Sequence, residues 1–126
     1  PCGTDYKNLN NYSAVLKLVY GETSFLFTGD AQSQSEKEIT ADVSANVVKV
    51  GHHGSKTSSS QAFVSAVSPE YAVIEVGKDN SYGHPNAGVI ERWQNAGAEV
   101  LRTDLNGSIT FTSDGSNISY TCEKER

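Results

Sequence analysis

The chain has 126 residues, of which 37% are hydrophobic and 20% are charged, and its formal net charge at pH 7 is −5. This length and apolar content fit one globular domain with a sizeable core and leave no room for a second. No apolar run approaches the ~18 residues of a membrane span, and a negative chain could bind nucleic acid only through bound cations or a local basic patch.

The chain begins with a predicted hairpin and a predicted helix. Apolar and other side chains alternate in residues 12–20 (YSAVLKLVY), as in a strand, and a GET turn leads to a second strand, residues 24–28. The second strand ends at Gly29, which places Asp30 at its C-terminal end. Residues 31–42 are polar and contain good helix formers with few apolar anchors. They predict a short, largely exposed helix.

The middle of the chain predicts two buried strands with a helix between them. Residues 45–50 (ANVVKV) are a near-continuous β-branched run, typical of a strand covered on both faces, and end at Gly51. Residues 60–68 place apolar side chains at helical spacing behind a serine N-cap, and Pro69 ends that helix. Residues 71–77 (YAVIEVG) predict the second buried strand.

The last third predicts one helix and three short strands. The helix spans residues 87–97 and closes on a C-terminal glycine. The strands lie in the segments AEVLRT, GSITFTSDG and SNISYTCEK, with hairpin turns expected at Asn106–Gly107 and Asp114–Gly115. The complete order of elements predicts an α/β domain in which helices pack against a mixed sheet.

Three loops that follow apolar strands hold the candidate metal ligands of the chain. The first loop contains Asp30, the second contains His52 and His53, and the third contains His84, so all three histidines of the chain fall in such loops. In layered α/β folds, binding sites collect beyond the carboxyl ends of strands because rigid strands hold the loop ligands in place.

Each candidate also has an ordinary structural explanation. Asp30 could bridge two metal ions, or it could cap the helix that follows it. The pair His52 and His53 could take part in chemistry, or it could be a polar turn with one histidine bonded to the backbone and the other exposed. His84 lies in a rigid glycine–proline turn that would fix a ligand, although a lone loop histidine is often structural.

The sequence around the histidine pair suits a phosphate. A glycine on each side of the pair would let the backbone approach a ligand closely, and Ser55, Lys56 and Thr57 add hydroxyl, amide and ammonium donors. The helix that starts near Ser60 would add its dipole and free N–H groups.

The two cysteines, Cys2 and Cys122, lie near opposite ends of the chain. They are too far apart in sequence for the close spacing of a zinc or redox motif. They could form a terminus-to-terminus disulfide or remain as two free thiols.

Four segments, NNYSAVLKLVYGETSFLFTGDA, VVKVGHHGSKTSSSQAF, VGKDNSYGHP and LRTDLNGSITFTSDG, resemble in their order the metallo-β-lactamase-fold domain of ComEC-type competence proteins. The resemblance runs from about Asn11 to Gly115 and matches the C-terminal half of that domain. It implies that residues 1–126 are a single partial domain, the C-terminal half of an αββα sandwich and a fragment of a longer protein.

The resemblance implies a metal-dependent hydrolase, in this branch a nuclease that degrades the non-transported DNA strand during uptake. Two zinc or manganese ions would act in the complete domain. Asp30 resembles the metal-bridging aspartate of the family, and His84 resembles its late metal-binding histidine. The loop GHHGS resembles the one whose histidine acts near the scissile phosphate, which favours His52 with His53 as the alternative. The residues that would orient the phosphate are Ser55, Lys56 and Thr57.

One departure from the family pattern limits the implied activity. The leading metal motif, His-x-His-x-Asp-His, is absent from the chain. Because a dinuclear site needs several further ligands, we expect the isolated chain to bind metal weakly or not at all and to be inactive. A non-catalytic interaction or DNA-guiding module is the alternative, and lipid or nucleotide phosphodiesters and small esters remain open as other substrates.

Half of a two-sheet sandwich would expose the inner face of the remaining sheet, which is expected to include Leu16, Leu18, Phe25 and Phe27. A bare apolar patch of roughly several hundred Å² usually finds a partner. We therefore expect the isolated chain to self-associate, and the missing N-terminal half to cover this face in the full-length protein. The resemblance also implies DNA as a partner and an extracytoplasmic location, in a secreted relative or in a membrane protein whose other domains contact the membrane.

Overall fold

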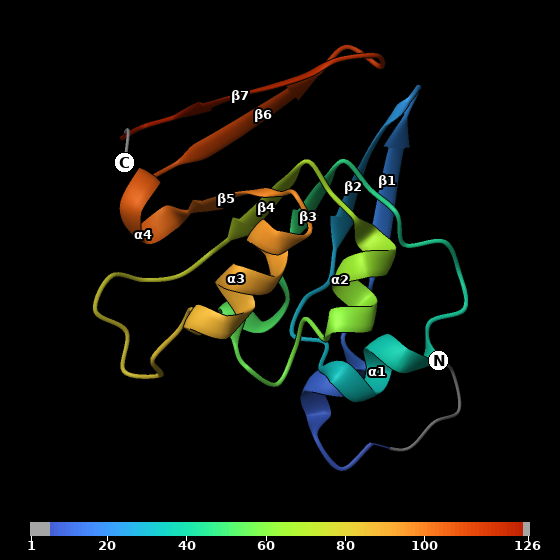
Figure 1. Ribbon diagram of the computed structural model, residues 1–126, viewed down its shortest axis with the longest axis vertical. Coiled ribbons are helices and arrows are strands. Elements are labelled where there is room, and N and C mark those ends of the chain that lie inside the picture. Colours follow the sequence, from blue (N-terminus) through green and yellow to red (C-terminus); the bar gives the residue numbers. More distant parts are fainter. Residues whose placement is uncertain (1–5, 125–126) are drawn as a thin grey trace.

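A five-stranded mixed sheet forms the centre of the computed structural model, which describes residues 6–124 (Figure 1). Its strands, in spatial order, are β1 (Leu16–Tyr20), β2 (Thr23–Phe27), β3 (Val47–Lys49), β4 (Tyr71–Ile74) and β5 (Glu99–Arg102). β1 pairs with β2 in the antiparallel direction, whereas β2 to β5 run parallel. The prediction of an α/β fold with a mixed sheet is confirmed.

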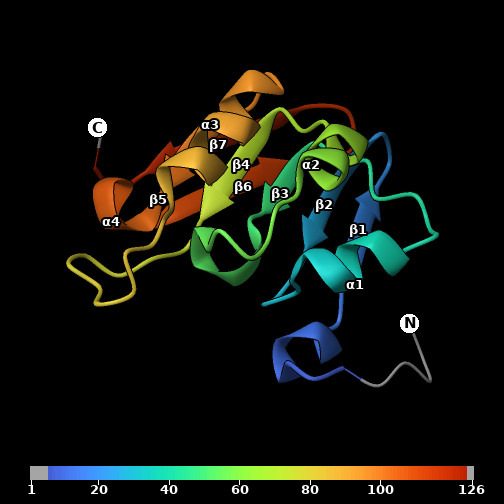
Figure 2. The same ribbon diagram turned by 60° about the horizontal axis from the view of Figure 1, so that its bottom comes forward.

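Three helices follow the first three parallel strands, as βαβ crossovers require. They are α1 (Ser33–Glu38), α2 (Gln61–Val67) and α3 (Ala87–Asn95), and they lie on one face of the sheet (Figure 2). The core between this face and the helices contains Val48, Ile74 and Trp93, each with 0% of its surface exposed. None of the helices within residues 6–124 is long and apolar enough to cross a membrane.

The predicted cap of the second helix is confirmed in detail. The Ser60 side chain accepts a hydrogen bond from the Phe63 N–H at the start of α2, and Ser68 takes a left-handed conformation after its end, just before Pro69. Several predicted elements are shorter in the structure, the first strand and the first helix most of all. The first strand, predicted over residues 12–20, begins only at Leu16, after a 3₁₀ turn, η1 (Leu9–Tyr12). Helix α1 covers only six residues of the predicted 31–42. The expected exposure of that helix is also wrong in part, because Ser35 and Glu36 are buried.

The prediction of a hairpin at Asn106–Gly107 is wrong. Residues 103–106 form a one-turn helix, α4 (Thr103–Asn106), and β5 does not pair with the next strand. The Asn106 side chain accepts a hydrogen bond from the Arg102 N–H at 2.9 Å, and Gly107 has φ 68°. Side-chain capping of the strand end therefore replaces the tight turn and directs the chain out of the sheet.

The hairpin at Asp114–Gly115 is confirmed. It joins β6 (Ile109–Ser113) to β7 (Ile118–Cys122) in a separate two-stranded sheet. The Asp114 carboxylate accepts hydrogen bonds from the N–H groups of Ser116 and Asn117, which stabilises the turn. Cys122 is half-buried at the end of β7. The choice between a disulfide and two free thiols is not tested, because Cys2 lies outside the described residues.

The face of the main sheet opposite the helices is only partly covered. The β6–β7 hairpin lies over β4, where the Tyr71 ring meets the rings of Phe111 and Tyr120 at centroid distances of 5.4 and 5.2 Å. Tyr120 also donates a hydrogen bond to Glu99 at 2.7 Å, and this bond raises the pKa of the phenol to about 12. The hairpin is thus attached to the β4–β5 side of the sheet.

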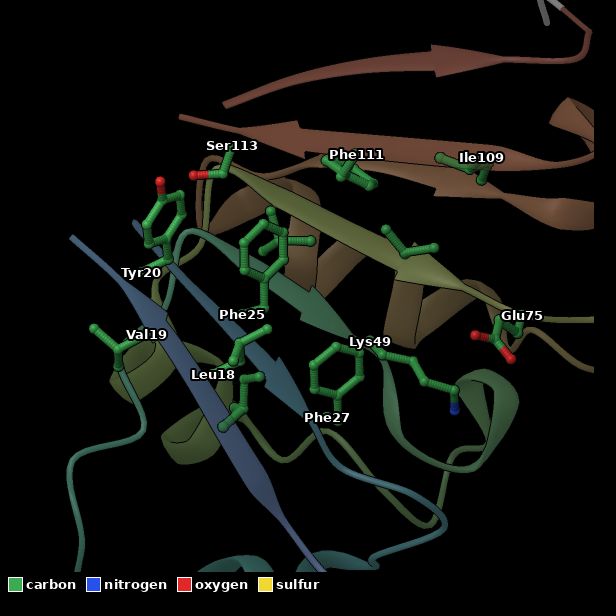
Figure 3. A pocket seen from close by; sticks show the side chains of 13 residues that line it. Leu18, Val19, Tyr20, Phe25, Phe27, Lys49, Glu75, Ile109, Phe111 and Ser113 are labelled. Atoms are coloured by element: carbon green, nitrogen blue, oxygen red, sulfur yellow. The ribbon is translucent and has the colours of Figure 1, made fainter. Parts of the chain in front are cut away.

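The β1–β2 side of that face is open, as the sequence predicted. The exposed fractions of Leu16, Leu18 and Phe27 are 63%, 57% and 43%, and Phe25 is half-buried. A groove of about 750 Å³ lies between these strands and β6 (Figure 3). The groove is apolar along most of its length and has Lys49 and Glu75 at one end.

Candidate functional site

The candidate residues come together at one edge of the main sheet. Because β2, β3 and β4 are adjacent and parallel, the loops that follow them begin at the same edge. Backbone hydrogen bonds then join the loops: the His52 N–H donates to the Gly29 carbonyl at 2.9 Å, and the Asn86 N–H donates to the Gly54 carbonyl at 2.9 Å. The three loops that carry Asp30, the histidine pair and His84 are therefore one connected structure.

Asp30 faces His53 rather than the helix that follows it. The distance from Asp30 Oδ1 to His53 Nε2 is 3.8 Å, and both side chains are nearly half exposed. The N-cap position of α1 belongs to Gln32, so the capping explanation of Asp30 is wrong. The backbone N–H of Asp30 donates to the Ser13 hydroxyl at 3.1 Å, which holds the aspartate at the end of its strand.

The second nitrogen of His53 has a defined partner. Nδ1 lies 2.7 Å from the backbone carbonyl of Glu75, so it carries the proton and donates it to that oxygen. A neutral His53 consequently presents the lone pair of Nε2 toward Asp30. A carbonyl that orients the distal nitrogen in this way is typical of metal-binding histidines.

His52 is held between two polar side chains. Its Nδ1 lies 3.2 Å from Thr57 Oγ1, and its Nε2 lies 3.4 Å from the side-chain amide of Asn10. Asn10 belongs to η1, far from His52 in sequence. It was not identified from the sequence as a site residue, because nothing in the local pattern of η1 indicates a contact with the histidine loop.

His84 completes the cluster through ring contacts. Its imidazole meets the His52 ring edge to face, with centroids 5.7 Å apart and an interplanar angle of 71°. Desolvation by burial lowers the pKa of His84, and charge repulsion from His52 and His53 in their protonated forms lowers it further. A lowered pKa favours the neutral imidazole, which is the form that binds a metal ion.

The backbone of the histidine pair is strained. His52 and His53 have φ values of 52° and 53°, in the left-handed region, which costs a non-glycine residue about 1–2 kcal/mol. Gly54, at φ 80°, has no such penalty, and a Cβ atom there would lie 2.6 Å from Cβ of Pro85. The glycine was expected to admit a ligand, whereas in the structure it lets the loop of the histidine pair contact the loop of His84.

The expected phosphate donors are arranged differently from the prediction. The N–H groups of Ser59 and Ser60, just before α2, donate to the Glu36 carboxylate at 2.7 and 3.0 Å, so these two N–H groups are not free for a phosphate. Ser55 is buried, with its hydroxyl 2.9 Å from that of Thr57. Lys56 and Thr57 are exposed.

Glu36 is a residue of the loop framework that the sequence pattern did not reveal. Its side chain is buried, although it lies in a segment that reads as a solvated polar helix. The two backbone N–H bonds offset the cost of burying the carboxylate, and they order the segment of Ser59 and Ser60 that donates them. Ser33 of α1 anchors the neighbouring loop, because its N–H and its hydroxyl donate to the Thr57 carbonyl at 2.9 and 3.0 Å.

The donor types of this cluster fit a divalent metal, but the set is incomplete. Carboxylate and imidazole groups suit zinc and manganese. Within residues 6–124, no three histidine, cysteine, aspartate or glutamate side chains are grouped so that they could hold a metal ion. A metal at this edge would therefore need donors in addition to those the described residues bring together.

The chain is similar to one segment of several longer proteins. It is 40% identical over 114 residues to ComE operon protein 3 of Bacillus subtilis (strain 168), an alignment that covers 88% of this chain and 15% of that protein. It is 42% identical over 114 residues to Competence protein ComA of Neisseria gonorrhoeae, with 86% and 16% covered, and 36% identical over 101 residues to Recombination protein 2 of Haemophilus influenzae, with 79% and 13% covered.

These alignments support the resemblance to competence proteins, over a segment that is about 15% of the length of the first two relatives. They do not identify the metallo-β-lactamase fold. No family model matches the chain, and no solved structure matches it significantly.

Proposed function

We propose that this chain forms part of a divalent-metal-dependent hydrolase site that cleaves DNA phosphodiester bonds during DNA uptake in competence. The observation that carries the proposal is the 3.8 Å pair of Asp30 and His53 beside His52 and His84, on loops after three adjacent parallel strands. The names of two relatives, ComE operon protein 3 and Competence protein ComA, point to competence.

Each residue of the cluster has a role in this proposal. Asp30, His53 and His84 would each contribute a donor to a zinc or manganese site, which the described residues do not complete by themselves. A bound pair of such ions supplies Lewis acidity and positive charge at the scissile phosphate. His52 would give a proton to the leaving oxygen or stabilise negative charge on the phosphate. The exposed side chains of Lys56 and Thr57 would orient the phosphate, with the Ser55 hydroxyl holding Thr57 in place.

The remaining donors would come from polypeptide outside residues 1–126. In a complete αββα sandwich, the N-terminal half would supply the His-x-His-x-Asp-His motif and would cover the groove beside β1 and β2. This domain would lie outside the cytoplasm, either in a membrane protein whose other domains contact the lipid or in a secreted relative. The resemblance to ComEC-type proteins is the support for these points.

The test compares this chain with a longer polypeptide that includes the sequence encoded before it. We expect the longer polypeptide to degrade single-stranded DNA when Mn²⁺ or Zn²⁺ is added, and we expect EDTA or Asp30→Ala to abolish that activity. This chain alone should release no nucleotides under the same conditions. DNA binding without hydrolysis by the longer polypeptide would contradict the proposal and would support the alternative of a DNA-guiding module.

The open apolar groove predicts self-association of the chain when it is expressed alone. Leu18 is 57% exposed in the groove, and burial of such a surface between two copies removes apolar area from water. Sedimentation equilibrium should show dimers or larger species, and Leu18→Glu should shift them toward the monomer. Leu9→Glu is the matched control, because Leu9 is 79% exposed and does not line the groove. A monomeric wild-type chain at high concentration would contradict this prediction.

A further inference from the structure

Tyr82 places an exposed aromatic ring at the edge of the candidate site. It lies in the loop between β4 and α3, which extends away from the body of the fold (Figure 1), and its exposed fraction is 80%. One face of the ring stacks on His84, with centroids 5.7 Å apart and an interplanar angle of 27°. Because His84 also contacts His52, the three rings form a continuous array from the histidine cluster to the solvent.

The loop holds this ring in position without burying it. The Asn80 side-chain oxygen accepts hydrogen bonds from the N–H groups of Tyr82 and His84, at 3.2 and 3.1 Å. The amide nitrogen of Asn80 donates to the carbonyl of His84 at 2.6 Å and to that of Gly77 at 3.1 Å. The polar atoms of one side chain therefore order the segment that carries both rings, so the position of Tyr82 is set before any ligand arrives.

An open aromatic face beside the proposed phosphate site suits a nucleobase. Every base has a flat face, so stacking on tyrosine tolerates any sequence. In a duplex these faces are covered by neighbouring base pairs, and a protruding ring can stack only on an unpaired base. The net charge of −5 also provides no broad basic surface for the backbone of duplex DNA.

We propose that Tyr82 stacks on an unpaired base next to the bound phosphate and makes the site selective for single-stranded DNA. This inference rests on the proposed function for the phosphate site, but it concerns binding and not cleavage. The loss of one stacked base typically weakens binding by about tenfold or more.

The experiment measures the binding of this chain to fluorescein-labelled oligonucleotides by fluorescence anisotropy at low salt, in EDTA and again in Mn²⁺. The probes are a thymidine 15-mer, an abasic strand of the same length and a 15-base-pair duplex. Tyr82→Ala should weaken binding of the thymidine strand about tenfold, whereas Tyr82→Phe should stay within about twofold of wild type. The control is Tyr20→Ala, because Tyr20 is also exposed but lies at the opposite edge of the sheet.

The abasic strand separates stacking from a general effect on the site. It should bind the wild type and Tyr82→Ala equally, and the duplex should bind both more weakly than the thymidine strand. The inference is overturned if the wild type binds no oligonucleotide or does not prefer the thymidine strand to the abasic strand. It is also overturned if Tyr82→Ala binds the thymidine strand as tightly as the wild type does. If stacking is observed but the longer polypeptide does not cleave DNA, the hydrolase proposal fails and the role of Tyr82 stands.

Discussion

His52→Ala is expected to slow DNA hydrolysis by the longer polypeptide by about 10²–10⁴-fold, the usual contribution of a general acid or base. The His52 ring is held by Thr57 on one side and by Asn10 on the other, and it lies beside His84. It has no direct contact with Asp30 among the interactions of the described residues. The loss should therefore fall on the turnover number, with little change in metal affinity. Single-turnover cleavage of a labelled single strand at saturating Mn²⁺ measures the effect.

His53→Ala is the matched variant, because it removes the neighbouring imidazole of the same turn. His53 faces Asp30 at 3.8 Å, so its removal should weaken metal binding. Activity of His53→Ala should consequently recover in part as Mn²⁺ is raised, whereas activity of His52→Ala should not. Recovery of His52→Ala at high Mn²⁺ would show that the two roles are exchanged.

Trp93→Ala is expected to destabilise the fold by about 3–5 kcal/mol, which is the usual cost of removing a large aromatic side chain from a core. Trp93 lies on α3 with 0% of its surface exposed, in the same cluster as Val48 and Ile74. Its removal leaves a cavity between the helices and the sheet. Urea unfolding followed by circular dichroism gives the change in the free energy of unfolding.

Trp93→Phe should cost much less than Trp93→Ala. The indole N–H of Trp93 makes no hydrogen bond within the described part of the chain, and an unsatisfied buried donor costs about 1–3 kcal/mol. Phenylalanine keeps most of the packing and removes that donor, so the two effects oppose each other. A cost for Trp93→Ala below about 1 kcal/mol would mean that α3 repacks freely on the sheet.

Much of the fold follows from local patterns. The apolar runs that became β3 and β4 could be predicted as strands because β-branched residues favour extended backbone, and Val48, Ala72 and Ile74 in them are buried. The serine cap of α2 and the turn at Asp114 depend on bonds between near neighbours in sequence, so they could be predicted residue by residue. The ends of helices and strands were less predictable, as the short α1 and the turn η1 show.

The errors arise where a polar side chain makes a hydrogen bond that the local pattern does not indicate. The dipeptide Asn106–Gly107 is a common hairpin turn, but the Asn106 side chain caps the end of β5 instead. The start of α2 was expected to offer free N–H groups, and Glu36 from another element accepts those of Ser59 and Ser60. The Asn106 bond is local but competes with the hairpin turn, whereas the Glu36 bonds join residues 23 and 24 positions apart and depend on how the elements pack.

The sequence by itself determined the α/β class, the apolar strands and the presence of Asp30, His52, His53 and His84 at strand ends, since alternation, propensity and turn chemistry are local properties. Only the tertiary structure decided that β2, β3 and β4 are neighbours, that His53 and not His52 faces Asp30, and that the ring of Tyr82 stacks on His84. Those facts depend on strand order and on the left-handed turn of the histidine pair, which bring together residues that are far apart along the chain.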